Sequence, residues 1–305
     1  MEKIIKWKDF EFVVRDFELS HANGGRLGKL WVEDLKSGRI FLVKGSGKFS
    51  YEPFSEKMAY IIGKNLGIDV LEYDIVPAEL FRDVLFVNPK CSYVSICEKI
   101  DRKGYSISSI AEIKRARNAI IEDEKDKVTN KQVMYEILPK EYIDTMLLFD
   151  AIIGNEDRHY GNVHVIRGKN GEIAGAPILD NGAGLLALRS TFEIMLFGNR
   201  AGEIYNRSFT TETTHDRQLE GVDQINNIDF NITSKTIQIL SELKPTLDLM
   251  PERRAKVIRQ FVVYRLHKYL GMIKYDSSRE YLIKRKNFRR ILKENEQSKI
   301  IGLFS

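Results

Sequence analysis

The residues best suited to chemistry lie in one short stretch of the chain, between Asp157 and Asp180. Asp157, Asn162 and Asp180 all carry side-chain oxygens, and the residues between Asn162 and Asp180 predict two strands joined by a turn at residues 168–171. Because a hairpin brings its two ends together, we expect these three side chains to converge. Carboxylate and amide oxygens are the ligands that hard cations prefer. The pattern therefore predicts a site for a divalent cation such as Mg²⁺.

The spacing of these residues indicates phosphoryl transfer. Protein kinases carry a catalytic Asp and a metal-binding Asn in the pattern D-x-x-x-x-N, and a second metal-binding Asp follows a short hairpin. Asp157 and Asn162 have that separation, and Asp180 begins the sequence Asp-Asn-Gly. Asp157 is expected to orient or accept the proton of an attacking hydroxyl group, while Asn162 and Asp180 would hold Mg²⁺ against the phosphates.

The loop resembles that of one branch of kinases, the HipA-like family. Its catalytic loop reads Asn-x-Asp-x-His-x-x-Asn, which is met here by Asn155, Asp157, His159 and Asn162. The resemblance implies ATP and Mg²⁺ as ligands and a protein Ser or Thr as the acceptor, often with autophosphorylation. His159 would either contact phosphate or brace the loop. Arg158 would either pair with a phosphorylated side chain or have no role in the reaction.

A lysine earlier in the chain has the context of a phosphate-binding residue. Lys44 ends the apolar strand expected at residues 40–43, and a helix is expected from Pro53 to Gly67. In a kinase-like lobe such a lysine pairs with the ATP phosphates, and a helix carboxylate holds it in place. Glu56 or Glu52 is within reach of that role. The alternative is a surface lysine at a strand end, with glutamates that merely suit the helix N-terminus.

Two further segments are assigned to ATP by their position. Gly24, Gly25 and Gly28 lie between the first two expected strands, where glycine permits a close backbone approach to phosphate or simply makes a turn. The resemblance places Glu98 and Ile100 against adenine and Asp101 near the ribose. The alternative for this second segment is a charged turn after an edge strand.

The elements expected around these residues give a two-lobed α+β fold of the protein-kinase kind. Residues 1–98 are expected to form the first lobe, a small antiparallel sheet with one helix, and residues 99–305 a mainly helical second lobe. Alternation predicts strands within residues 9–44, 73–81, 84–87 and 93–102. Helical spacing begins at Ile107 and returns at residues 142–153, 192–197, 234–243, 254–273 and 279–296. On the helix before the catalytic loop, Asp144 and Asp150 are expected to face outward or to cap.

Composition narrows the class of protein and its partners. The chain of 305 residues has a net charge of +5, a mild excess that suits a phosphate-bearing ligand. Its basic terminal helices are expected to be solvated rather than to bind nucleic acid. Cys91 and Cys97 are too far apart along one strand to bond, which favours a reducing cytoplasm, and no apolar run is long enough for a signal peptide or a membrane span. Secretion without a signal peptide stays open.

The alternatives to a protein kinase are a zinc site, a hydrolase, an inactive scaffold and a kinase with another acceptor. The spacing of Asp157, His159 and His164 does not match the zinc motifs, and the Gly-x-Ser-x-Gly elbow of hydrolases is absent from the sequence. A catalytically inactive, kinase-like scaffold that binds nucleotide or a partner stays open, as does a lipid or small-molecule acceptor. Only about twenty residues precede the glycine loop, so the chain resembles the shorter HipA-like kinases, and a DNA-binding antitoxin partner is not expected.

Overall fold

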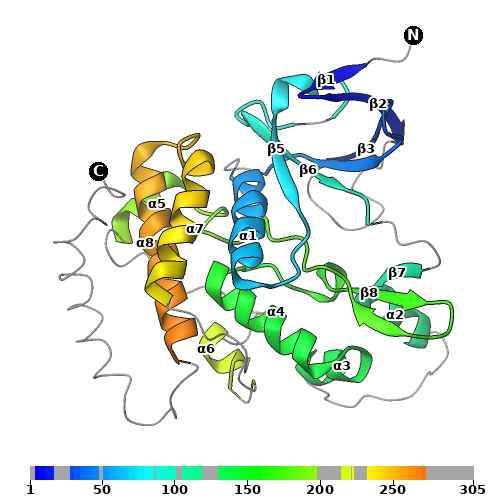
Figure 1. Cartoon of the computed structure of the whole chain (residues 1–305), viewed down its shortest axis with the longest axis vertical. Coiled ribbons are helices and arrows are strands. Elements are labelled where there is room, and N and C mark those ends of the chain that lie inside the picture. Colours follow the sequence, from blue (N-terminus) through cyan, green and yellow to red (C-terminus); the bar gives the residue numbers. More distant parts are fainter. Residues whose placement is uncertain are drawn as a thin grey trace.

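The computed structural model describes residues 4–16, 28–47, 51–85, 87–100, 105–118, 130–197, 214–220, 222 and 232–272. Gly24, Gly25, Asp101 and the helix expected at residues 279–296 lie outside these ranges. The described residues form an antiparallel sheet with one long helix beside it, followed by a mainly helical part that carries a smaller sheet (Figure 1). The α+β architecture expected from the sequence is therefore confirmed.

The larger sheet has six antiparallel strands in the order β1-β2-β3-β4-β6-β5. Their bounds are Ile5–Trp7, Phe10–Asp16, Lys29–Asp34, Ile40–Lys44, Tyr73–Pro77 (β5) and Tyr93–Glu98 (β6). Alternate residues point to opposite faces, and β3 shows this plainly because every second side chain is buried. Phe12, Leu30, Val32 and Val43 form the centre of the core on one face.

The prediction of a strand at residues 84–87 is wrong for the three described residues, 84, 85 and 87. The backbone amides of Val84 and Leu85 both donate to the Phe81 carbonyl oxygen, so the chain forms a tight turn there. A short 3-10 helix, η1 (Ala78–Leu80), precedes this turn. Leu85 nevertheless packs into the core of the sheet. Apolar side chains are buried here although the backbone forms no strand. The apolar pattern of the sequence does not distinguish such a buried turn from a strand.

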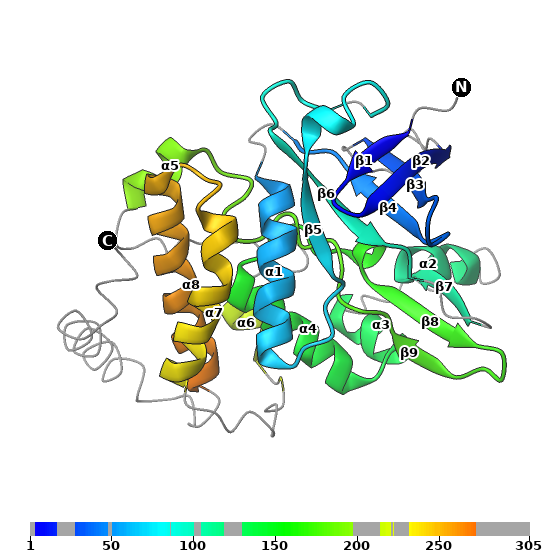
Figure 2. The same ribbon diagram turned by 45° about the horizontal axis from the view of Figure 1, so that its top comes forward.

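Helix α1 (Glu52–Leu66) connects the sheet to the helical part. A proline in the first turn favours its start, and it ends at Gly67, whose φ of +71° is the left-handed conformation in which glycine has no steric penalty. In Figures 1 and 2, α1 lies between β5 and α7. Its buried residues Met58 and Ile62 belong to the same core cluster as the helices that follow. The side chains of α1 are thus held from both sides.

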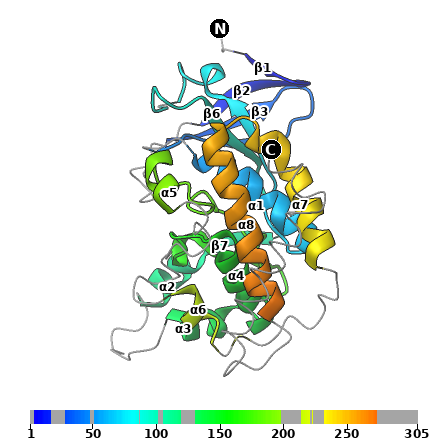
Figure 3. The same ribbon diagram turned by 90° about the vertical axis from the view of Figure 1, so that its left-hand side faces the viewer.

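The helical part is built on α4 (Lys140–Ile153), α7 (Ile232–Leu247) and α8 (Glu252–Met272). In Figure 3, α8 runs the length of this part, and it packs against α4 and α7. Shorter helices complete it: α2 (Ile110–Asn118), α3 (Asn130–Ile137), α5 (Thr191–Phe197) and α6 (His215–Gln218). Phe149, Ile152, Phe261 and Leu266 are fully buried among them. None of the helices in the described ranges has the length and apolar character needed to cross a lipid bilayer.

A second sheet holds the hairpin expected after the catalytic loop. It consists of β7 (Tyr105–Ser109), β8 (His164–Gly168) and β9 (Ile173–Gly175), in that order (Figure 2). The hairpin β8-β9 is therefore confirmed. The helix expected from Ile107 begins three residues later than expected, at Ile110, because residues up to Ser109 pair with β8. Strand pairing with a distant segment overrode the local helical spacing.

Cys91 and Cys97 are both buried, and no disulfide joins them. They are not on one strand, however, because β6 begins at Tyr93 and Cys91 precedes it. Cys97 lies within β6, opposite Leu42 of β4 and Tyr73 of β5.

Candidate active site

The loop that the sequence predicts to be catalytic begins where α4 ends. Gly154 adopts a φ of +63° and its N–H caps the Asp150 carbonyl, so the helix stops and the chain turns outward. The amide of Asn155 donates to the same carbonyl oxygen at 2.9 Å. The local sequence thus fixes the point from which residues 155–162 extend.

Arg158 organises this loop from inside the protein. Its Nε and Nη2 donate to the two carboxylate oxygens of Asp150, each at 2.9 Å. Nη2 also donates to Asn181 Oδ1, and Nη1 donates to the carbonyl oxygens of Asn162 and Leu179. These contacts use all five N–H groups of the guanidinium. Arg158 therefore joins the loop to the segment that carries Asp180.

The expectation that Asp144 and Asp150 face outward or cap is wrong. Asp150 does not face outward, because its side chain is 1% exposed and paired with Arg158; Asp144 is also buried, and it accepts a hydrogen bond from Tyr135 Oη at 2.6 Å. Arg158 cannot read a phosphorylated side chain while all its donors are occupied. Burial acts to lower the pKa of Arg158, but Asp150 raises it above the usual value, so the guanidinium stays charged.

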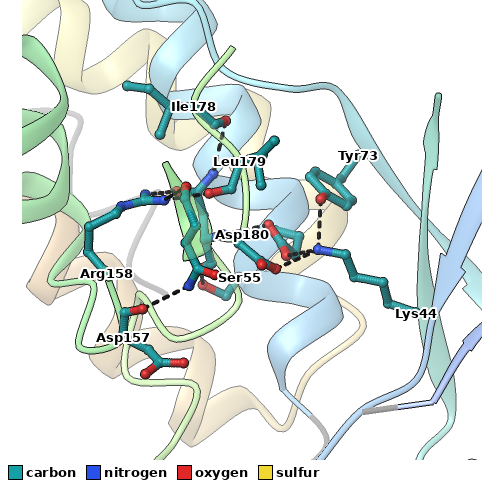
Figure 4. Close-up of polar contacts among 11 residues, drawn as sticks. Lys44, Ser55, Tyr73, Asp157, Arg158, Ile178, Leu179 and Asp180 are labelled. Carbon is teal, nitrogen blue, oxygen red and sulfur yellow. Dashed lines mark hydrogen bonds and ion pairs between the residues drawn. The ribbon is translucent and has the colours of Figure 1, made fainter. Parts of the chain in front are cut away.

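The exposed side of the loop carries the residues expected to meet substrate. Asp157 is exposed, and none of the dashed lines in Figure 4 ends on its carboxylate. Asn162 Nδ2 donates to the Asp157 carbonyl oxygen at 2.8 Å, which fixes the amide and leaves Oδ1 as its remaining polar atom. His159 Nδ1 accepts from the Gly161 amide at 3.0 Å, so the neutral ring carries its proton on Nε2. His159 thus braces the loop.

Lys44 is the centre of a second polar cluster (Figure 4). Its Nζ donates to Asp180 Oδ1 at 2.6 Å, to Glu56 Oε1 at 3.2 Å and to Tyr73 Oη at 2.8 Å. The side chains of Lys44 and Glu56 are 6% and 4% exposed, whereas that of Asp180 is 34% exposed. The expected contact between Lys44 and a carboxylate of α1 is present, and Asp180 is the partner that faces solvent.

Glu56 also holds the Asp-Asn-Gly segment. Its second oxygen accepts from the Asn181 amide at 2.8 Å, while the neighbouring Ser55 hydroxyl donates to the Asn181 carbonyl at 2.7 Å. Asp180 has a φ of +59°, a left-handed conformation that aspartate tolerates better than most residues. Glu52, the other carboxylate considered for Lys44, instead accepts from the Ser46 hydroxyl and the Gly47 amide. The register of α1 therefore selects Glu56.

The charges in this cluster support one another. Burial alone would lower the pKa of Lys44, but Asp180 and Glu56 raise it well above the usual value. Burial would likewise raise the pKa of Asp180, yet attraction to Lys44 lowers it below the usual range. For Glu56, burial raises the pKa and Lys44 only partly offsets that. The site therefore presents an ammonium group that stays protonated at neutral pH.

The segment expected to bind adenine ends β6. The Lys99 amide donates to the Ile40 carbonyl, so alternation along the strand directs the N–H and C=O of Glu98 to the other side, towards β5. The ladder with β5 begins at the pair Tyr73 and Cys97, so Glu98 lies just beyond it. The Glu98 side chain is exposed and paired with Arg39 at 3.1 Å. If this segment binds adenine as expected, the backbone N–H and C=O of Glu98 are in position to do so, and its carboxylate is not.

The remaining predicted residues are only partly described. Gly28 lies beside the start of β3, where its carbonyl accepts from the Gly45 amide next to Lys44. Ile100 follows β6 and is partly buried. Among the described residues, no three His, Cys, Asp or Glu side chains gather in a way that could hold a metal ion. The donor set at Asp180 and Asn162 is a carboxylate and an amide, which suits Mg²⁺ rather than a transition metal.

Tyr73 and Asn181 are two polar residues of this site that the sequence did not single out. Tyr73 was expected only as part of a strand, and Asn181 only as part of the Asp-Asn-Gly sequence. Both make their contacts with residues far away in the chain. No local signal distinguishes such residues, because the contacts depend on strand register and on how α1 packs.

Comparison with solved structures identifies the fold. The Helicobacter pylori proinflammatory kinase CtkA matches with a TM-score of 0.57 and 19% identity, over 85% of this chain and 94% of that chain. HipA of Shewanella oneidensis MR-1, solved with HipB and operator DNA, matches with a TM-score of 0.45 and 13% identity, over 82% of this chain and 65% of that chain. A mutant of the Neurospora crassa PAN3 pseudokinase matches with a TM-score of 0.33 and 11% identity, over 95% of this chain and 69% of that chain.

Of these three, the likeness to CtkA is close enough to show the fold. The chain has a two-lobed, kinase-like fold similar to that of this kinase, as its sequence predicted. No protein-family model and no curated protein matches the chain by sequence.

Proposed function

We propose that this chain transfers the γ-phosphoryl group of ATP to a serine or threonine hydroxyl of a protein. The observation that carries the proposal is the position of Lys44, which is buried, charged and bonded at once to Glu56 of α1 and Asp180 after the hairpin. Phosphoryl transfer asks mainly for positioning and charge neutralisation. A lysine held between two carboxylates, one of which faces solvent, suits that requirement.

Asp180 and Asn162 are the residues that would hold Mg²⁺. Arg158 Nη1 contacts both the Asn162 carbonyl and the Leu179 carbonyl, so the two segments lie side by side. Asn162 keeps Oδ1 for a ligand because Nδ2 is bonded to Asp157 O. When bound, Mg²⁺ neutralises charge on the phosphates. Asp180 would exchange its contact with Lys44 for the ion, which frees the ammonium group for phosphate oxygens.

Asp157 is the residue that would act on the acceptor. Its carboxylate is exposed, and its backbone is fixed from both sides, since its carbonyl accepts from Asn162 and its amide donates to Asn155 Oδ1 at 3.2 Å. A carboxylate on a rigid loop can orient the acceptor hydroxyl and take its proton as the new bond forms. His159 would support this loop through the bond to Gly161.

The nucleotide itself would lie between the two lobes, which we divide near Glu98. The backbone of Glu98 and Ile100 would meet adenine, and Asp101 the ribose. Gly24, Gly25 and Gly28 would line the phosphates. The acceptor is proposed from the HipA-like fold, and autophosphorylation near Gly24 or within residues 208–214 is part of the proposal. A DNA-binding antitoxin partner is not part of the proposal.

A transfer assay tests the proposal. Purified protein is incubated with Mg²⁺ and γ-labelled ATP, with and without a generic protein substrate, and phosphosites are mapped by mass spectrometry. Wild type should incorporate label on Ser or Thr, and Asp157→Ala should lose it while still binding MgATP. Binding without transfer in wild type would instead identify a nucleotide-binding scaffold. Labelled lipid or small molecules, with no labelled protein, would move the acceptor to another class.

A further inference from the structure

Tyr73 makes an unexpected contact behind the proposed phosphate-binding lysine. Its side chain is 1% exposed, and its hydroxyl accepts a hydrogen bond from Lys44 Nζ at 2.8 Å. The Lys44 ammonium also lies 4.8 Å from the centre of the Tyr73 ring. Figure 4 shows the hydroxyl approaching Nζ from a different direction than Asp180.

The register of the sheet puts Tyr73 there. Tyr73 of β5 lies opposite Cys97 of β6, which lies opposite Leu42 of β4. Residues in such a row across a sheet project from the same face, and so does Lys44, two positions after Leu42. Tyr73 is long enough to reach across β6 to Lys44. The contact is thus a fixed property of the strand pairing.

The Tyr73 hydroxyl accepts the third hydrogen bond of the Lys44 ammonium group without adding a negative charge. Lys44 has three N–H donors, and Glu56, Asp180 and Tyr73 take one each. Burial raises the pKa of Tyr73 well above its usual value and that of Cys97 to about 11, so both stay neutral. A third carboxylate here would cancel the charge that phosphate needs. An apolar side chain would leave a buried N–H unpaired.

We propose that Tyr73 is a positioning residue, which keeps the Lys44 ammonium aimed at the phosphates when Asp180 turns to the metal. This inference rests on the proposed function, in which Asp180 leaves Lys44. Glu56 and Tyr73 then remain as two fixed partners on the protein side. Without the hydroxyl, one partner is left and the ammonium can swing away. Tyr73 therefore acts through Lys44 and does not touch the nucleotide.

Calorimetric titration of Tyr73→Phe with MgATP, MgADP and adenosine tests this. The variant keeps the ring and removes the hydroxyl, so we expect about tenfold weaker binding of both phosphorylated nucleotides, as for a lost hydrogen bond to a charged group. Adenosine should bind as to wild type. The matched control is Tyr93→Phe, since Tyr93 of β6 packs on the Phe54 ring and should leave all three affinities unchanged.

A double-mutant cycle separates positioning through Lys44 from a general effect on the fold. In a Lys44→Met background, Tyr73→Phe should cause no further loss of MgADP affinity. An equal loss with and without Lys44 would overturn the inference. Tyr73→Gln and Tyr73→Leu repeat the test without the aromatic ring, and the amide oxygen should retain more affinity. The expected split in kinetics is a raised KM for ATP with kcat changed less than about threefold.

The outcome also distinguishes this inference from the proposed function. If wild type binds and uses MgATP and Tyr73→Phe matches it in every measurement, Tyr73 has no positioning role and the function stands. If wild type does not bind MgATP, both are overturned.

Discussion

Two buried ion-pair networks lie side by side in this fold, and they differ in what their charges are free to do. The lysine network consists of Lys44, Glu56, Tyr73 and Asp180, and the arginine network of Asp150, Asn155, Arg158 and Asn181. Asp180 is 34% exposed, whereas the side chains of Arg158 and Asp150 are 0% and 1% exposed. In the proposed function, the lysine network exchanges the contact with Asp180 for a ligand. The arginine network does not.

The comparison of the two networks shows that burial of a charge does not by itself indicate a reactive site. Arg158 follows directly after the proposed catalytic Asp157, yet every one of its donors is used within the protein. It therefore sets the shape of the loop. Lys44 is as strongly paired, but one of its acceptors, Asp180, is a carboxylate that faces solvent and that we propose as a metal ligand.

The networks meet at Asn181. Arg158 binds its side-chain oxygen and Glu56 binds its backbone amide. The arginine network thus anchors the segment that begins with Asp180, and the lysine network includes Asp180 itself. Mutations in the two networks should accordingly separate loss of fold from loss of ligand.

The largest expected effect is on stability, from Arg158→Met. Removing the guanidinium leaves the Asp150 carboxylate buried without its partner, which should lower the free energy of unfolding by about 3–5 kcal/mol. Urea denaturation monitored by circular dichroism measures this. Arg167→Met, at an exposed position of β8, is the matched control and should stay within about 0.5 kcal/mol of wild type. Equal stability of the two variants would remove the distinction between the networks.

Lys44→Met should have a large effect on activity and a smaller one on the fold. We expect kcat/KM for ATP to fall by about 100-fold or more, because the positive charge at the phosphates is lost. Asp180 can be hydrated and Glu56, with its raised pKa, can take up a proton, so stability should fall less than in Arg158→Met. Steady-state kinetics and urea denaturation are compared on the same preparations. Unfolding as severe as in Arg158→Met would contradict the account.

The pH dependence of stability should show which carboxylate is paired. Asp180 has a depressed pKa, so its pairing stabilises the protein above the unfolded value of about 3.9 and is lost as the pH falls through the folded pKa. The stability difference between wild type and Asp180→Asn should be constant from about pH 5 to 9 and shrink below about pH 4. Denaturation at fixed pH steps measures it. A difference that grows on acidification would have the wrong sign.

The smallest expected effect is from Glu98→Ala. The Glu98 carboxylate is exposed and paired with Arg39 on the surface, where such pairs contribute about 0–1 kcal/mol. If the backbone of Glu98 meets adenine, nucleotide affinity should stay within about twofold of wild type. Titration with MgADP checks this. A loss as large as that of Lys44→Met would mean that the side chain itself binds the nucleotide.

The sequence predicted those parts of the site that follow from local pattern. The hairpin after Asn162, the strand ending in Lys44 and the helix after Pro53 were all readable, because turn residues and periodicity lie within each segment. The choice between Glu52 and Glu56 was not, since it depends on how α1 packs against the sheet. Asp150 was misjudged because a charged residue on an amphipathic helix is usually exposed, and its partner follows only after the helix has ended.

Long-range register accounts for the rest. Tyr73 meets Lys44 only because β5 pairs with the far side of β6, and residues 107–109 form a strand only because β8 is beside them. Neither pairing leaves a signal in the nearby sequence. The kinase-like order of elements could be predicted, whereas the contacts that hold its site together could not.

The role of Lys44 in binding the phosphates is tested by calorimetric titration of MgATP into wild type and Lys44→Met, with Arg167→Met as the control. We expect MgATP to bind to wild type and to the control, and to bind Lys44→Met about 100-fold or more weakly, with adenosine binding unchanged in all three. Equal affinity of wild type and Lys44→Met for MgATP would contradict that role.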